Sequence, residues 1–324
     1  MGAMGSVSSG AEAATSGERV GKRRGASVST DLLEVRHTTT YRYSEPVEFG
    51  PHRAMFRPHD SHDLRLLGIE ITASPQASLR WLHDAFSNSI TTFEFSEPAD
   101  TLSVSSVFQV VRSTIHEPDF PIAESAQRYP FNYDPDQRVD LSAAIAPEYD
   151  HPSEMVREWA RSFADENGCD TWSILESMVK QIHSGFRYER REEAGVQAPR
   201  ETLELQCGSC RDFAVLMMEG VRQLGFAARF VTGYLYDPLS DKEGVMRGAG
   251  ATHAWVQVFL PGAGWVEFDP TNGLIASGNL IRTGVARRPS QAAPFAGSFK
   301  GPSQAFVSLD VTVDVRALAP TLTG

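Results

Sequence analysis

Gly208-Ser209-Cys210-Arg211-Asp212-Phe213-Ala214 is the most informative segment of this 324-residue chain. Apolar residues recur from Phe213 to Leu224 with helical spacing, and Gly225 is expected to end the helix. Cys210 therefore stands where a loop becomes a helix, beside unpaired backbone N–H groups and the positive end of the helix dipole. Both favour the thiolate, which is the nucleophilic form of cysteine. A lone cysteine is more often structural, so this interpretation depends on its partners.

His253 and Asp269 are the candidate partners of this thiol. His253 opens one predicted strand, His253–Leu260, and Asp269 closes the next, Gly264–Asp269. An imidazole can take the thiol proton and later protonate a leaving amine, and a carboxylate can fix the tautomer of the imidazole. Cys210, His253 and Asp269 are therefore the predicted nucleophile, base and orienting acid.

The alternation of side chains makes a further prediction about these two strands. With an even-numbered loop between them, Asp269 would oppose Val256, on the wrong face for His253. A three-residue loop would place Asp269 opposite Trp255 and diagonal to His253. We therefore predict an odd loop count or a β-bulge, with the Asp269 carboxylate within about 3.2 Å of a ring nitrogen of His253.

Four motifs resemble the bacterial transglutaminase-like superfamily, in the order that is usual for it, over about residues 150 to 275. They are Gly208 to Ala214, Gly225-Phe226-Ala227-Ala228-Arg229-Phe230-Val231-Thr232-Gly233-Tyr234, His253-Ala254-Trp255-Val256 and Gly264-Trp265-Val266-Glu267-Phe268-Asp269-Pro270-Thr271-Asn272. The resemblance implies a papain-like core, with Cys210 as nucleophile, His253 as base and Asp269 as third member of the triad. It implies neither a metal nor an organic cofactor.

The N-terminal part predicts an antiparallel β domain, sandwich-like or barrel-like. Its strands are β-branched or aromatic runs between Pro, Asp and Ser clusters: Val35–Tyr43, Leu66–Ala73 (with Leu67, Ile69 and Ile71 on one face), Ile90–Phe95 and Leu102–Val111. This part also resembles the β domain that precedes the core in many bacterial members, through Arg36 to Ser44, Pro46-Val47 and Asp84-Ala85-Phe86-Ser87-Asn88. That family usually has Phe-Gly-Asn in the last motif, so Ser87 is expected to alter one turn.

The predicted fold class is α+β, with the antiparallel β domain followed by the papain-like transglutaminase core. Helices are predicted after Ser153 and from Ile174 to Ile182, where apolar residues keep helical spacing. Five parts are predicted: a disordered tail (1–30), the β domain (31–116), an acidic, proline-rich linker or excursion (117–151), the core (152–276) and a C-terminal part (277–324). The last part is predicted as a loop, Gly278–Pro302, and a strand, Ala305–Val315, that could return to the β domain.

Composition and charge exclude several classes of protein. The net charge of −11 argues against the broad phosphate-binding face of a nucleic-acid-binding protein, and no apolar run is long enough to span a membrane. Three cysteines are too few for a secreted disulfide framework, which favours a reducing, cytoplasmic location. His52, His59 and His62 make a metal site conceivable, but their spacing matches no ligand rule, so turn or surface histidines are favoured.

The motifs predict acyl transfer on amide bonds of a peptide or protein substrate. Water as acceptor would make the protein a cysteine peptidase or amidase, which is the favoured interpretation, and a primary amine would make it a transglutaminase. A non-catalytic peptide-binding module that keeps the fold is a third alternative. Cys207 and Cys210 also form a C-x-x-C, which predicts either a redox pair or, in preference, a regulatory disulfide that silences Cys210.

Five other side chains carry weaker predictions. Trp255 and Trp265 are expected to pack in the core, the alternative being the walls of a substrate groove. Asp212, in the first turn of the helix, is expected to be structural. Arg229 is expected to pair with a carboxylate, and Tyr188 is a weak candidate for a second oxyanion donor.

Overall fold

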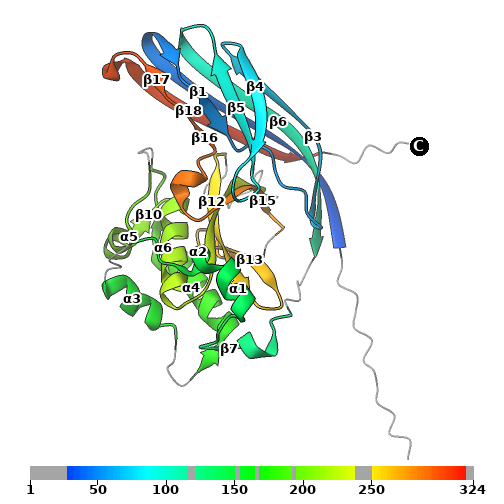
Figure 1. Cartoon of the computed structure of the whole chain (residues 1–324), viewed down its shortest axis with the longest axis vertical. Coiled ribbons are helices and arrows are strands. Elements are labelled where there is room, and N and C mark those ends of the chain that lie inside the picture. The colour runs from blue at the N-terminus through cyan, green and yellow to red at the C-terminus, as the bar shows by residue number, and fades with distance from the viewer. Residues whose placement is uncertain are drawn as a thin grey trace, which may run out of the picture.

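The computed structural model describes residues 28–115, 121–149, 154–164, 168–191, 195–237, 250–276 and 278–318. The predicted disordered tail lies mostly outside the described residues, but residues 28–30, which the sequence assigned to it, begin the first strand. Figure 1 shows the β domain stacked against a core in which helices gather beside a second set of strands.

The longest sheet of the β domain is built around β1 (Val28–Phe49). β1 pairs antiparallel with β6 (Ala99–Ile115) on one side and with β18 (Phe306–Ala317) on the other. β3 (Leu64–Ser74) extends the sheet beyond β6, and β17 (Phe299–Lys300) pairs with the end of β1. The last long strand of the chain therefore lies against the first (Figure 1).

A second sheet faces the first. Its strand order is β16 (Phe295–Ala296), β2 (His52–Ala54), β5 (Ser89–Phe95) and β4 (Ala77–His83). Apolar side chains from both sheets pack into one cluster between them, including Tyr43, Phe93 and Val104. The predicted sandwich-like arrangement is confirmed, because each sheet turns its apolar face toward the other.

The side-chain pattern predicted for the Leu66–Ala73 strand is wrong at one residue. Leu67 is 51% exposed, whereas Leu66, Ile69 and Ile71 are partly buried against the core. The register of β3 on β6 shifts between Leu66 and Gly68, so a β-bulge at Leu67 transfers the apolar series to the opposite parity. A strict period of two cannot anticipate such a shift.

The core contains a five-stranded sheet. Its order is β14 (Leu274–Ile275), β13 (Gly264–Asp269), β12 (His253–Leu260), β11 (Ala228–Leu235) and β15 (Leu280–Ala286), and every neighbouring pair is antiparallel. The prediction that Gly278–Pro302 is a loop is therefore wrong, because β15 closes one edge of this sheet. Six of its seven residues are buried, so it shows no apolar–polar alternation that could mark it as a strand.

Beside the sheet lie helices α3 (Glu154–Arg161), α4 (Thr171–Gly185), α5 (Pro199–Leu205) and α6 (Cys210–Gln223). Of these, α3, α4 and α6 were predicted, and the shorter helix α5 was not. α6 is buried along almost its whole length and packs on β11 and β12 with an extensive apolar cluster. Its end follows the prediction, since Gly225 takes a left-handed conformation (φ 88°) just beyond it.

Residues 121–149 form short elements that pack on the core. They comprise a 3-10 turn (Glu124–Ala126), β7 (Arg128–Tyr129), α1 (Pro135–Asp140) and α2 (Ser142–Ile145). The hydroxyl of Tyr133 donates to the carbonyl of Phe259 and accepts from the N–H of Ala227, both at 2.9 Å. These bonds fix the segment to β12 and to the start of β11.

The two domains share a buried interface. Tyr234 of β11 and Ile281 of β15 lie in one apolar cluster with Leu33, Phe108 and other residues of the β domain. His37 of β1 lies 2.8 Å from the Tyr234 hydroxyl through Nδ1. Burial lowers the pKa of His37 to about 4, so this contact joins two neutral groups at neutral pH.

Candidate active site

Cys210 is the first residue of α6, as predicted, and its side chain is buried. The residues before it, Cys207 and Gly208, form β10, which pairs in parallel with β9 (Arg187–Tyr188). Position 208 has no room for a side chain, because a Cβ on Gly208 would lie 2.9 Å from both the Asp212 side chain and the amide oxygen of Gln197. The close approach of these groups brings the preceding loop tightly against the start of the helix.

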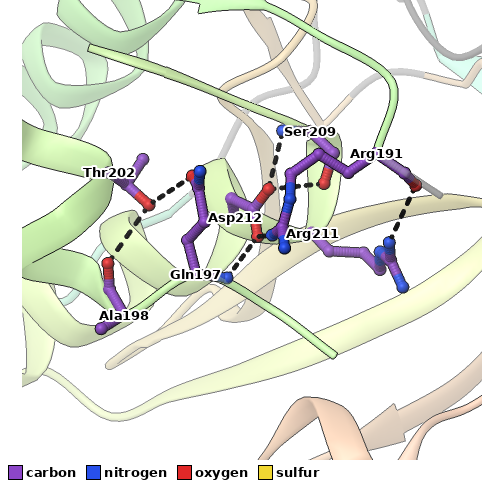
Figure 2. Close-up of polar contacts among 7 residues, drawn as sticks. All are labelled: Arg191, Gln197, Ala198, Thr202, Ser209, Arg211 and Asp212. Atoms are coloured by element: carbon purple, nitrogen blue, oxygen red, sulfur yellow. Dashed lines mark hydrogen bonds and ion pairs between the residues drawn. The ribbon is translucent and has the colours of Figure 1, made fainter. Parts of the chain in front are cut away.

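Asp212 is the anchor of this region (Figure 2). Its fully buried carboxylate accepts four hydrogen bonds: from Arg191 Nη1 (2.9 Å) and the Gln197 N–H (2.7 Å) through Oδ1, and from the Ser209 N–H and Oγ (2.8 Å each) through Oδ2. Asp212 therefore has the structural role that the sequence predicts, and it fulfils this role through these four hydrogen bonds. The side chain satisfies the backbone before the helix and ties two other segments to the residue next to Cys210.

β12 and β13 meet as the sequence predicts. Leu260 pairs with Gly264, so the connection has three residues, 261–263, and Val256 pairs with Phe268. The same register brings Asp269 diagonal to His253. Asp269 Oδ2 lies 2.8 Å from His253 Nε2, and both side chains are fully buried.

Two neighbours that the sequence did not single out hold the Asp269 carboxylate in place. The Thr271 N–H donates to Oδ1 at 2.9 Å, and Asn272 Nδ2 donates to Oδ2 at 2.9 Å. An aspartate that accepts from the backbone two residues later forms an Asx turn. The Asp-Pro-Thr-Asn sequence contains the residue types for this turn. Whether Thr271 and Asn272 point toward the Asp269 carboxylate depends on the backbone conformation after β13.

The electrostatics of the pair follow from its burial. Burial alone would lower the pKa of His253, but the adjacent Asp269 outweighs it and raises this pKa to about 10, with a further contribution from the thiol of Cys210. Burial would raise the pKa of Asp269, and the interaction with His253 and the bonds from Asn272 and Thr271 lower it instead. Both shifts favour an imidazolium–carboxylate pair.

The remaining ring nitrogen, Nδ1 of His253, is buried without a regular hydrogen bond among the described residues. Because Nε2 is held by Asp269, Nδ1 is the nitrogen available for proton exchange with the nearby thiol of Cys210. The structure therefore brings the three predicted residues together from the start of α6, the start of β12 and the end of β13.

Cys207 and Tyr188 lie on the strand pair that precedes α6. Burial raises the pKa of the Cys207 thiol, and hydrogen bonding to Glu189 raises it further. Burial likewise raises the pKa of Tyr188 to about 12, with the next contribution from Cys210. The thiol of Cys207 therefore interacts with Glu189, and the hydroxyl of Tyr188 interacts electrostatically with Cys210. Cys207 and Cys210 are not joined by a disulfide in this structure, and the regulatory disulfide stays a prediction.

Trp255 packs in the core as expected, whereas Trp265 is half-buried, and Arg229 has unexpected partners. Trp255 is fully buried and stacks on the His253 ring with a centroid separation of 5.9 Å. Trp265 lies under the Arg229 guanidinium, whose carbon is 4.1 Å from the ring centroid. Among the described residues Arg229 forms no ion pair with a carboxylate: its Nε donates to the Gln257 amide oxygen at 2.7 Å, and Gln257 in turn donates to Glu267.

No group of three or more His, Cys, Asp or Glu side chains is placed to hold a metal ion within the part of the chain that the structure describes. Of the candidate histidines, His52 is buried, with Nδ1 2.8 Å from the Gly50 carbonyl oxygen. No helix among the described residues has the length and hydropathy needed to cross a lipid bilayer.

The fold and this site define a class of protein: a papain-like thiol core in which a cysteine at a helix start faces a histidine–aspartate pair on adjacent strands. Residues 33–111 match the model of the bacterial transglutaminase-like N-terminal region, and residues 157–270 match the model of the transglutaminase-like superfamily. Both matched regions agree with the family that the motifs resemble. The chain combines a bacterial transglutaminase-like N-terminal region with a transglutaminase-like core.

Relatives and solved structures agree with this assignment. An uncharacterized protein of Mycobacterium tuberculosis is 29% identical over 299 residues, which cover 88% of this chain and 93% of the relative. An uncharacterized protein of Mycobacterium leprae is 36% identical over 115 residues, covering 35% and 39%. The crystal structure of a proposed cysteine protease from Cytophaga hutchinsonii aligns with a TM-score of 0.67 and 17% identity, covering 91% and 94%. The fold of both domains is therefore shared with a solved structure.

Proposed function

We propose that this protein is a thiol-dependent hydrolase of amide bonds in a peptide or protein, a cysteine peptidase or amidase. The observation that carries the proposal is the fully buried 2.8 Å contact between His253 Nε2 and Asp269 Oδ2, which leaves Nδ1 for the thiol at the start of α6. A carboxylate that fixes the imidazole and an imidazole that serves a nucleophile are the working parts of a catalytic triad.

The reaction divides into acylation and deacylation. The resting site holds the thiol proton of Cys210 on His253 Nδ1, as a thiolate–imidazolium pair, and the thiolate sulfur attacks the substrate carbonyl carbon. The backbone N–H groups at the start of α6 stabilise the oxyanion that develops. The carbon–nitrogen bond breaks, the proton on His253 passes to the departing amine, and the acyl group remains on sulfur as a thioester.

Deacylation returns the site to its starting state. Water attacks the thioester carbonyl, giving one proton to His253, and the carbon–sulfur bond breaks to release the thiolate while that proton stays on His253. Asp269 keeps its negative charge throughout and stabilises the imidazolium at each stage. Asn272 and Thr271 act through Asp269, because they donate to its oxygens.

The test is turnover of a mixed peptide library with mass-spectrometric readout, with and without added methylamine. Cleaved or deamidated peptides that do not depend on methylamine are the expected products, and the Cys210→Ala protein is expected to make none. Methylamine adducts as the main product would replace hydrolysis by transamidation. Peptide binding without any turnover in the wild-type protein would assign a non-catalytic binding module.

We also propose a cytoplasmic location. A thiol nucleophile three residues from a second buried thiol works in its reduced form, and reducing compartments maintain that form. Fractionation of the source cells with an antibody to this protein tests the proposal. Recovery in the secreted or surface fraction would contradict it.

A further inference from the structure

A cavity of about 720 Å³ lies between the two domains. Its lining combines His37 and Tyr41 of β1, Leu309 and Val311 of β18, and Phe295 of β16 with residues of the core. The volume falls in the range of about 300–1,000 Å³ that is usual for ligand pockets. One wall of this pocket is therefore supplied by the domain that carries none of the candidate catalytic residues.

The cavity reaches the candidate active site at His253, while Cys210 is not among its lining residues. Arg211, the residue after Cys210, lines it, and so do His253 and its neighbours Thr252 and Ala254 at the start of β12. Gly195 and Val196 also line it, directly before Gln197, which the Asp212 carboxylate holds. A peptide whose carbonyl lies at the start of α6 would thus have part of its chain inside this cavity.

The walls contributed by the β domain are largely apolar. Leu309 is 45% exposed, although it is a large aliphatic residue, and it stands on a strand that closes the cavity on one side. Phe295 packs tilted against Tyr41 with ring centroids 6.0 Å apart, so two aromatic rings form an adjoining surface. Exposed aliphatic and aromatic surface inside a pocket favours an apolar occupant.

The charges in the cavity disfavour a cationic occupant. Glu148 is the carboxylate residue among the described lining residues, and it pairs with Arg287 and, at 3.0 Å, with Arg288. Arg211 and Arg288 also line the cavity, and among the described lining residues the carboxylate of Glu148 already has guanidinium partners. A lysine or arginine side chain would therefore find no uncompensated carboxylate among these residues.

We propose that the interdomain cavity binds a large, uncharged apolar side chain of the peptide substrate close to the bond that reacts. The β domain then selects the substrate, while the core performs the chemistry. This inference rests on the proposed function, because it assigns a subsite to that same reaction. It predicts a preference for phenylalanine or leucine over alanine, and discrimination against lysine, at one position near the reacting bond.

Leu309→Trp tests the proposal, because it narrows the cavity from a strand that carries no catalytic group. The matched control is Val307→Trp on the same strand, since Val307 is 60% exposed and does not line the cavity. Leu309→Ala, which enlarges the cavity, is a second variant in case the tryptophan disturbs folding. Urea unfolding of each variant reports its fold.

The readout is the ratio of kcat/KM for phenylalanine over alanine peptides at the responsive position. We expect Leu309→Trp to reduce this ratio by about tenfold or more, through KM rather than kcat, since pocket contacts discriminate by this order. Leu309→Ala should shift the preference toward bulkier side chains, and Val307→Trp should leave the ratio unchanged. Equal ratios in wild type, Leu309→Trp and Leu309→Ala would overturn the inference and leave the proposed function standing.

Binding separates this inference from the reaction itself. Calorimetric titration of the Cys210→Ala protein with the same phenylalanine and alanine peptides measures the pocket without turnover. Tighter binding of the phenylalanine peptide, lost in Cys210→Ala/Leu309→Trp, supports the pocket even if the wild-type protein hydrolyses no peptide. Equal affinity for the two peptides in Cys210→Ala overturns it.

Discussion

The side-chain amide of Asn88 in the β domain is hydrogen-bonded in both directions to the backbone of Val285 in the core sheet. Nδ2 donates to the Val285 carbonyl at 2.7 Å, and Oδ1 accepts from the Val285 N–H at 2.8 Å. Nδ2 also donates to Asp84 Oδ2 at 2.8 Å. This fully buried amide therefore pairs with the backbone of β15 as a neighbouring strand would, and it joins the two domains.

Asn88→Ala should lower the free energy of unfolding by about 3 kcal/mol, because it leaves a buried N–H and a buried carbonyl of Val285 without partners. The urea midpoint measures the change. Asn132→Ala is the matched control, since Asn132 is exposed and should shift the midpoint little. Equal midpoints for the two variants would show that the Asn88 contact contributes nothing to domain docking.

Ser87→Gly should raise the free energy of unfolding by up to about 1 kcal/mol. Ser87 adopts a left-handed conformation with φ 63°, which strains a residue that has a Cβ and suits the glycine usual in this motif. Ser89→Gly is the control with the opposite sign, because Ser89 begins β5 and glycine weakens a strand. A lower urea midpoint for Ser87→Gly would refute the assignment of strain to this turn.

The sequence predicted well the elements whose apolar residues repeat regularly and whose ends are marked by turn residues. β12 and β13 have the predicted boundaries, because β-branched and aromatic runs end at turn glycines. α6 shows helical spacing over fourteen residues, and its glycine ends it. The need for an odd loop or a β-bulge could be deduced, because a regular hairpin with an even loop would place Asp269 and His253 on opposite faces, and the structure has the odd loop.

The features that the sequence missed depend on distant residues. β15 is buried on both faces, so its pattern has no period, and only its pairing with β11 identifies it as a strand. Arg229 finds an amide and an indole, which β12 and β13 bring to it. Asn272 was visible in the Asp-Pro-Thr-Asn motif, but its bond to Asp269 depends on the turn after β13.

The His253–Asp269 pair should make stability depend on pH in a window that the pKa shifts define. His253 has a pKa raised from 6.5 to about 10, so its contribution is complete below pH 6.5 and is lost as pH rises toward 10. Asp269 has a lowered pKa, so its contribution is present above 3.8 and is lost as pH falls below that value.

Asp269→Asn should therefore flatten the decline in stability between pH 6.5 and 10, where one group contributes at most about 1.4 kcal/mol per pH unit. Urea midpoints of wild type and Asp269→Asn across pH 5 to 10 test this. Parallel curves for the two proteins would mean that the pair does not titrate as the structure implies.

Asp212→Asn should destabilise the protein by about 3 kcal/mol. The buried carboxylate accepts hydrogen bonds through both oxygens, and in the variant an amide nitrogen would replace one oxygen and face N–H donors without accepting from them. Hydrogen exchange should quicken at the Gln197 and Ser209 amides, which reports the loosening of the segment beside Cys210. Asp170→Asn is the control, since Asp170 caps α4 at an exposed position where asparagine caps equally well. Unchanged exchange at Gln197 would remove Asp212 as the anchor.

Cys210 should react with iodoacetamide faster than Cys207, and the reason is chemical rather than steric, because each residue is 7% exposed. Burial and the neighbouring Glu189 raise the pKa of Cys207 and keep it a thiol, whereas Cys210 stands at a helix start beside His253. Mass spectrometry of the alkylated peptides should show at least tenfold faster labelling of Cys210, and His253→Ala should remove most of that advantage.

Cys207→Ala should keep substantial turnover under reducing conditions, and Cys210→Ala should keep none. Faster labelling of Cys207, or full turnover by Cys210→Ala, would contradict the assignment of Cys210 as the nucleophile. The His253–Asp269 pair would then have a structural role.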